Sequence, residues 1–66
     1  MKLQPGDAIV ARRKVKSKIY HNTIVGPVLT ANENCCRVIT NAGTDIEADW
    51  QINYTDWSID ILLVAP

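Results

Sequence analysis

The stretch TIVGPVLTA, Thr23–Ala31, is rich in β-branched and other apolar residues and carries Gly26-Pro27 at its centre. Such side chains favour strands, because they pack well on a pleated surface and lose rotamer freedom in a helix. Proline cannot donate a hydrogen bond to a neighbouring strand, so its position requires a bulge, a bend or a sheet edge. We therefore predict a strand over Thr23–Ala31 that is interrupted near its middle.

Turn signals divide the neighbouring sequence into further short strands. The Pro-Gly pair of LQPGD, residues 3–7, precedes a predicted strand at Ala8–Arg13. The turns NEN, residues 32–34, and NAG, residues 41–43, bracket another predicted strand, Cys35–Thr40. Between the first two strands we expect a longer polar loop. This spacing predicts a small sheet of hairpins.

The segment TDIEADWQI, residues 44–52, shows the clearest alternation in the chain. Its apolar positions are Ile46, Ala48, Trp50 and Ile52, and they alternate with Asp45, Glu47, Asp49 and Gln51. Such a period of two predicts a strand with one face in the core, Trp50 included, and one acidic face. Neighbouring carboxylates can serve acid–base chemistry or hold Mg²⁺ or Ca²⁺. We interpret this acidic face as a solvated strand surface that resists aggregation.

The end of the chain predicts one more strand. NYTDW, residues 53–57, is interpreted as a single helical or 3₁₀ turn that leaves Trp57 on the surface, and SIDILLVA, residues 58–65, as the closing strand. At 66 residues the chain forms one domain, residues 1–66. Five strands, a long first loop and this turn predict an all-β, SH3-like five-stranded barrel, since closure protects the strand edges. An OB-like or open five-stranded sheet is the alternative.

Charge is distributed unevenly along a chain whose net charge is zero. Residues 1–37 carry all seven Lys and Arg and two carboxylates (7 − 2 = +5), whereas residues 38–66 carry five carboxylates and no Lys or Arg (−5). Five of the basic residues lie in ARRKVKSK, residues 11–18. A nonspecific polyanion binder usually has an overall basic excess, which is missing here. A surface with separate positive and negative regions is instead suited to contact with a protein partner or with a second copy of the chain.

Cysteine, histidine and hydropathy restrict the remaining chemistry. Cys35 and Cys36 are adjacent in a predicted strand and point to opposite faces, so we expect one core thiol and one surface thiol in a reducing compartment. A redox or intermolecular-disulfide role for the exposed thiol is the alternative. His21 adds at most one further ligand, so we predict no metal site and no cofactor. No nucleophile motif accompanies His21. No apolar run approaches the roughly 20 residues of a membrane span, and we expect a cytoplasmic protein.

The function we predict is noncatalytic binding: a small barrel that mediates protein–protein contact or self-assembly. Its expected contact residues combine the basic cluster with exposed aromatic side chains: Arg12, Arg13, Lys14, Lys16, Lys18, Tyr20, Tyr54 and Trp57. In a homo-oligomer, this basic loop would meet Asp45, Glu47 and Asp49 of a neighbour. The first alternative is nucleic-acid binding, with the cations on phosphates and Tyr20 stacked on a base.

A third hypothesis comes from a resemblance. The chain is similar to the plasmid-encoded type II dihydrofolate reductases, which are tetrameric SH3-like barrels. The matching motifs are Gly6-Asp7, Arg12-Arg13-Lys14, Tyr20, Ile24-Val25-Gly26 and the Gln51-Ile52 pair followed by Tyr54. The resemblance implies that Gln51 and Ile52 line a cofactor pore and that Arg13 or Lys14 is the basic residue beside it. A fold of this kind hosts many functions, so binding remains our first prediction.

Overall fold

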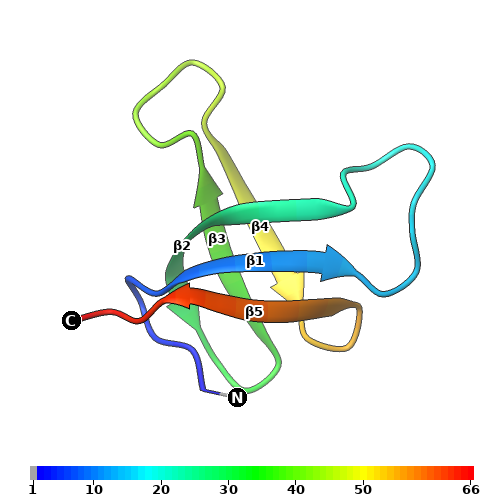
Figure 1. Ribbon diagram of the computed structural model, residues 1–66. Helices are drawn as coiled ribbons and strands as arrows, with labels where there is room; N and C mark the ends of the chain where they lie inside the picture. Colours follow the sequence, from blue (N-terminus) through cyan, green and yellow to red (C-terminus); the bar gives the residue numbers. More distant parts are fainter. Residues whose placement is uncertain (1) are drawn as a thin grey trace.

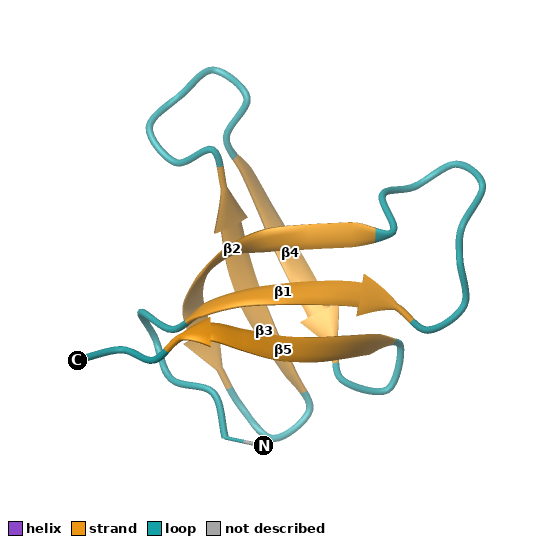
Figure 2. Ribbon diagram, viewed as in Figure 1, coloured by secondary structure: helices purple, strands orange, loops and turns teal. Residues whose placement is uncertain are grey.

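The computed structural model of the protein describes residues 2–66, which form five strands and no helix (Figures 1 and 2). The strands are β1 Ala8–Arg13, β2 Thr23–Ala31, β3 Cys35–Thr40, β4 Ala48–Asn53 and β5 Trp57–Leu63. The predicted bounds of the first three strands are confirmed. Between β4 and β5 the chain makes a hydrogen-bonded turn rather than a helix, in which Asp56 N–H donates to Asn53 O at 3.0 Å.

The strands form one antiparallel sheet in the order β4-β3-β2-β1-β5. The sheet is not closed: no ladder joins β4 to β5 within residues 2–66, so these two strands are its edges. In Figure 1, β1, β5 and the first part of β2 run across β3 and β4. The all-β class and the five antiparallel strands are confirmed, whereas the closure expected of a barrel is not found among residues 2–66.

The long strand β2 belongs to both halves of this arrangement. Its first part, through Pro27, pairs with β1, and its last part, from Val28, pairs with β3 with a register shift before Thr30. At Gly26 an added Cβ would lie 2.4 Å from the carbonyl oxygen of Ile39 on β3. The interruption predicted at Gly26-Pro27 is thus a place where one strand passes from one partner to another across a close backbone contact.

The core lies between the two halves of the sheet. Its members are the inward side chains of all five strands with one residue from the N-terminal segment: Leu3, Ile9, Ala11, Ile24, Val28, Cys36, Val38, Ile52, Trp57 and Ile59. Trp50, predicted to be a core residue, is half-buried and packs against this cluster from β4. Its indole N–H donates to Thr40 Oγ1 at 3.2 Å, so the polar end of the ring has a partner.

Asp7 ties the two ends of the described chain together. The Pro5-Gly6 pair forms a turn closed by Asp7 N–H donating to Gln4 O at 3.1 Å, with Gly6 at φ 93°. The Asp7 side chain, 1% exposed, accepts hydrogen bonds from Ala65 N–H at 2.7 Å and Gln4 N–H at 2.9 Å. These bonds, with Ala65 contributing most, lower the pKa of Asp7 against the opposing effect of burial.

Stability should therefore depend on the ionisation of Asp7. Because its folded-state pKa lies below the ordinary value of 3.8, the ionised side chain stabilises the fold above that pH and loses its effect as pH falls through the folded pKa. Asp7→Asn removes one acceptor and places an amide donor against backbone N–H groups. We expect wild type to melt well above Asp7→Asn at neutral pH, and the gap to narrow below pH 3.8.

Thermal unfolding followed by circular dichroism between pH 7 and pH 2 measures this gap. Acid destabilises both proteins through their other carboxylates, so the difference between the two melting temperatures is the informative quantity. A difference that is the same at pH 6 and pH 2 would show that the Asp7 charge does not stabilise the fold.

Candidate functional site

Residues 14–22, here called the first loop, are ordered by their own polar groups. Ser17 N–H donates to Asn22 Oδ1 at 2.7 Å, and Asn22 Nδ2 donates back to Ser17 O at 3.0 Å. Ser17 Oγ accepts hydrogen bonds from the N–H groups of Ile19 and Tyr20. Short polar side chains commonly bond nearby backbone in this way. The first loop, the largest projection beside β1 and β2 in Figure 2, is therefore held in a defined conformation.

The outer surface of the first loop combines cations with apolar side chains. Lys14, Lys16 and Lys18 are exposed and form no salt bridge within residues 2–66. Val15, which lies between the first two lysines, and Ile19, which follows the third, are 85% and 81% exposed. Exposed apolar side chains with charged groups around them are typical of protein contact surfaces. The three lysines and two apolar residues form the strongest candidate contact surface outside the sheet.

The two arginines of the predicted basic cluster have internal partners instead. Arg12 forms a salt bridge with Asp60 of β5 at 3.0 Å. Arg13 donates from Nε to His21 O at 2.6 Å, and its guanidinium lies 4.3 Å from the ring centroid of Trp57. The structure therefore divides the basic cluster into two arginines that position β1, β5 and the first loop, and three free lysines.

The predicted surface position of Trp57 is wrong, because Trp57 is a core residue, 6% exposed. It begins β5 rather than ending the preceding turn, so its side chain alternates inward with Ile59. The inward alternation of Trp57 and Ile59 is visible in the sequence, and extending the closing strand by one residue would have identified it. One face of the ring carries the Arg13 guanidinium, so Trp57 anchors the first loop from beneath.

Tyr20 and Tyr54, the two predicted tyrosine contacts, differ in accessibility. Tyr20 is 65% exposed, with the Arg13 guanidinium 5.9 Å from its ring centroid. Tyr54 is half-buried, and its hydroxyl has no hydrogen-bond partner among residues 2–66, although it lies beside the Cys36 thiol. Burial, followed by Cys36 and Cys35, raises the pKa of Tyr54. Only Tyr20 presents an open ring to a partner.

The predicted acidic strand face is wrong for Asp45 and Glu47, which lie in the loop of residues 41–47 before β4 begins. Asn41 and Gly43 adopt positive φ there, and Glu47 Oε1 accepts a hydrogen bond from Gly43 N–H at 3.0 Å. These local bonds compete with strand pairing. Ile46, predicted to face the core, is consequently 70% exposed.

The third acidic residue, Asp49, does lie on β4 but pairs within the chain. Arg37 of β3 donates to it from Nε at 3.2 Å and from the terminal guanidinium nitrogen at 2.9 Å. This pairing raises the pKa of Arg37. Within residues 2–66, none of Asp45, Glu47 and Asp49 forms a salt bridge with a lysine of the first loop.

The cysteines occupy the two faces that their adjacency predicts. Cys36 is buried in the core, Cys35 is half-buried, and both thiols are free. Burial raises the pKa of the Cys36 thiol. The rings of His21 and Trp50 form a T-shaped pair, with centroids 5.6 Å apart and planes at 83°. Within residues 2–66, no three His, Cys, Asp or Glu side chains are grouped as metal ligands.

The positions implied by the reductase resemblance separate in the structure. Gln51 lies exposed on the outer face of β4, whereas Ile52 is 0% exposed in the core. Successive residues of a strand point to opposite faces, so these two side chains do not line one surface. Ile52 is part of the hydrophobic core.

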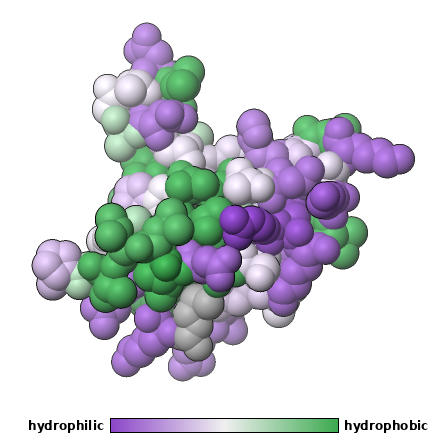
Figure 3. All heavy atoms as spheres, in the orientation of Figure 1, coloured by the Kyte–Doolittle hydropathy of each residue, from purple (hydrophilic) through white to green (hydrophobic). Residues whose placement is uncertain are grey.

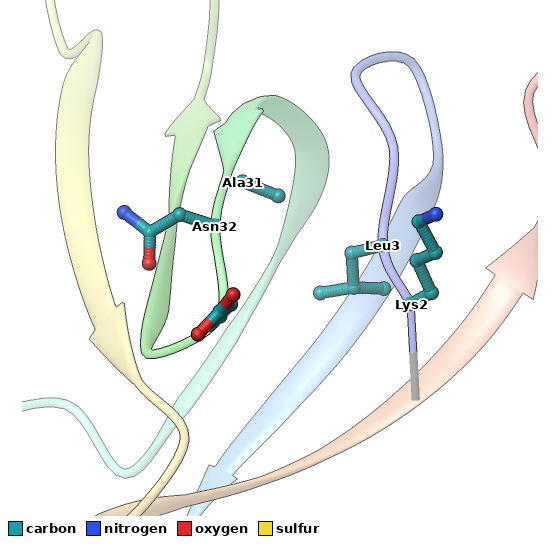
Figure 4. A pocket seen from close by; sticks show the side chains of 5 residues that line it. Lys2, Leu3, Ala31 and Asn32 are labelled. Atoms are coloured by element: carbon teal, nitrogen blue, oxygen red, sulfur yellow. The ribbon is translucent and has the colours of Figure 1, made fainter.

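Hollows that are partly open to solvent lie on the surface of the sheet. One of about 280 Å³ is lined by Glu33, Tyr54, Trp57 and Ile59. Another of about 380 Å³ lies between the N-terminal segment and the end of β2, where Leu3 and Ala31 point toward each other (Figure 4). The first of these hollows has Glu33 as its one charged lining residue, and the second has the opposite charges of Lys2 and Glu33. The first loop remains the better candidate.

The chain is thus a small all-β domain with five antiparallel strands and an exposed cationic loop. Comparison with protein-family models, with curated proteins and with solved structures finds no match. A membrane-spanning helix is not found in residues 2–66. The site itself must therefore carry the functional argument.

Proposed function

We propose that this protein is a noncatalytic, SH3-like binding domain whose first loop contacts an acidic surface on a protein partner. The observation that carries the proposal is the set of three exposed lysines, Lys14, Lys16 and Lys18, which form no salt bridge within residues 2–66 and are accompanied by exposed Val15 and Ile19. Apolar side chains at the centre of a contact, with charges around them, are the usual composition of a protein interface.

The strand arrangement supports the SH3-like part of the proposal. β2 contributes to two differently oriented groups of strands, β5-β1-β2 and β2-β3-β4, which enclose one core. A shared, bent strand of this kind is how a small sheet covers its own core without full closure. The long connection in this arrangement is the first loop.

Protein is favoured over nucleic acid as the partner for two reasons. Arg12 and Arg13, the residues best suited to bidentate phosphate binding, are engaged with Asp60, Trp57 and the His21 carbonyl. The exposed Val15 and Ile19 also lie next to lysines of the first loop in the sequence, and apolar side chains gain nothing from a phosphate backbone but bury well against another protein.

Binding to a labelled acidic peptide, with leucines among its glutamates, tests the proposal by fluorescence anisotropy. Lys16→Gln/Lys18→Gln should weaken binding roughly 3- to 10-fold at low salt, because each exposed ion pair is worth a few tenths to one kcal/mol. Val15→Ser/Ile19→Ser should also weaken it. The matched control Lys2→Gln/Arg37→Gln removes two positive charges elsewhere, with loss of the exposed Arg37–Asp49 pair, and should bind like wild type.

Single-stranded DNA, used as a second probe, separates the two partner classes. Tighter binding of DNA than of the peptide, with loss in the same lysine variant, would replace the protein partner with nucleic acid. Equal weakening in the lysine variant and in the matched control would mean that net charge, and not the first loop, drives the association.

A further inference from the structure

The last part of β5 exposes a continuous apolar segment at an open edge of the sheet. Ile61, Leu62, Leu63 and Val64 are between 39% and 77% exposed, and β5 pairs with β1 alone. A register shift next to Ile9 makes Leu62 an extra residue, which breaks the inward–outward alternation of the strand. Figure 3 shows apolar side chains gathered beside the C-terminus, over this end of β5 and the neighbouring strands.

The two sheet edges differ in their protection. The outward side chains of β4 are Asp49, Gln51 and Asn53, polar groups that discourage contact with another strand. Beyond Asp60, β5 has no charged side chain. An unpaired edge strand offers free backbone donors and acceptors, and a long apolar edge is a site at which another strand adds.

We propose that this edge, Ile61–Val64, pairs antiparallel with the same segment of a second copy. Pairing about a two-fold axis at Leu63 places Leu63 opposite Leu63 of the other copy, Leu62 opposite Val64 and Ile61 opposite Ala65, so every facing pair is apolar. The two Asp60 side chains then lie six residues apart along the strands (66 − 60), about 20 Å at strand spacing. That separation exceeds the Debye length of about 10 Å at 0.1 M salt, so their repulsion is screened.

A second copy fits better than a charged segment of another protein. The edge has no charged side chain past Asp60 to attract such a partner, whereas self-pairing matches apolar residues with apolar residues throughout. The backbone is also held ready for pairing, because Asp7 fixes Ala65 N–H at 2.7 Å and so restrains the end of the segment. Restraining a segment before it binds lowers the entropy that association costs.

Sedimentation equilibrium of wild type and two lysine variants tests the proposal. Leu63 and Ile46 are both 70% exposed, so Leu63→Lys and Ile46→Lys make equivalent changes at the edge and away from it. We expect the wild-type mass to approach twice the monomer value as concentration rises, with at least a tenfold weaker association for Leu63→Lys and no change for Ile46→Lys. Circular dichroism verifies that both variants fold.

Two further measurements identify the contact. Amide hydrogen exchange of residues 61–64 should slow as wild-type concentration rises, and 0.5 M salt should leave the dimer intact or strengthen it, because burial of apolar groups drives it. Lys16→Gln/Lys18→Gln should dimerise normally, which separates this contact from that of the first loop. A wild type that stays monomeric, a dimer that survives Leu63→Lys, or dissociation by Ile46→Lys would each overturn the proposal.

Discussion

Gly26→Ala is expected to destabilise the fold by about 3 kcal/mol, the upper end of what overpacking usually costs. The new Cβ would lie 2.4 Å from Ile39 O and 3.0 Å from Val38 Cγ1. The first of these atoms belongs to backbone held in the β3–β4 ladder, so it cannot move aside without breaking strand pairing. Urea unfolding followed by circular dichroism measures the loss.

This loss is a large share of the free energy of unfolding, which is roughly 3–10 kcal/mol for a domain of this size. The melting temperature should fall by about 12–24 °C. Gly43→Ala is the matched control: Gly43 has φ 79°, but an added Cβ there has no neighbour within 4 Å. Backbone strain alone should cost about 1 kcal/mol. Equal losses in the two variants would show that the close approach of β2 to β3 does not limit residue 26.

Trp57→Ala is expected to cost about 3–5 kcal/mol, the usual range for removing a large buried side chain. Trp57 packs in the core and also supports the Arg13 guanidinium at 4.3 Å. The variant therefore leaves a cavity beneath the base of the first loop. Urea unfolding again measures the change, with the fluorescence of the remaining Trp50 as the signal.

Trp57→Phe provides the comparison, because it keeps an aromatic ring in the core and should cost only about 1–2 kcal/mol. A surface tryptophan in a turn, as the sequence alone predicts, would change stability by no more than about 0.5 kcal/mol on replacement with alanine. A core Trp57 and a surface Trp57 thus predict losses of unfolding free energy for Trp57→Ala that differ by several kcal/mol. Urea unfolding of this variant decides between them.

The first loop and the β5 edge would serve different contacts. The first loop carries lysines and follows β1, while the apolar edge lies at the opposite end of β5, beside Ala8 in the register. If both proposals hold, a dimer formed through the β5 edges leaves both first loops free. A divalent molecule of this kind would bind a repeated acidic partner more tightly than one protomer does.

The sequence predicts β1, β2 and β3 because local signals agree there. Pro-Gly and Asn-containing turns flank runs of β-branched residues, and Gly26-Pro27 marks the point where β2 changes partners. The alternation of residues 45–52 is as regular, yet only its second half is strand. In residues 44–47 the hydrogen bonds of Thr44 and Glu47 with the turn stabilise a loop instead.

The sequence by itself therefore determined the all-β class, the turns and the segregation of charge, because each depends on residues that are close together along the chain. Only the tertiary structure decided which charges are free and which aromatic rings are buried. Arg12 meets Asp60, Arg13 meets Trp57 and Arg37 meets Asp49 across strands. Those contacts depend on register between distant segments, which a local pattern does not specify. Among residues 2–66, the lysines of the first loop, Lys14, Lys16 and Lys18, form no such ion pair.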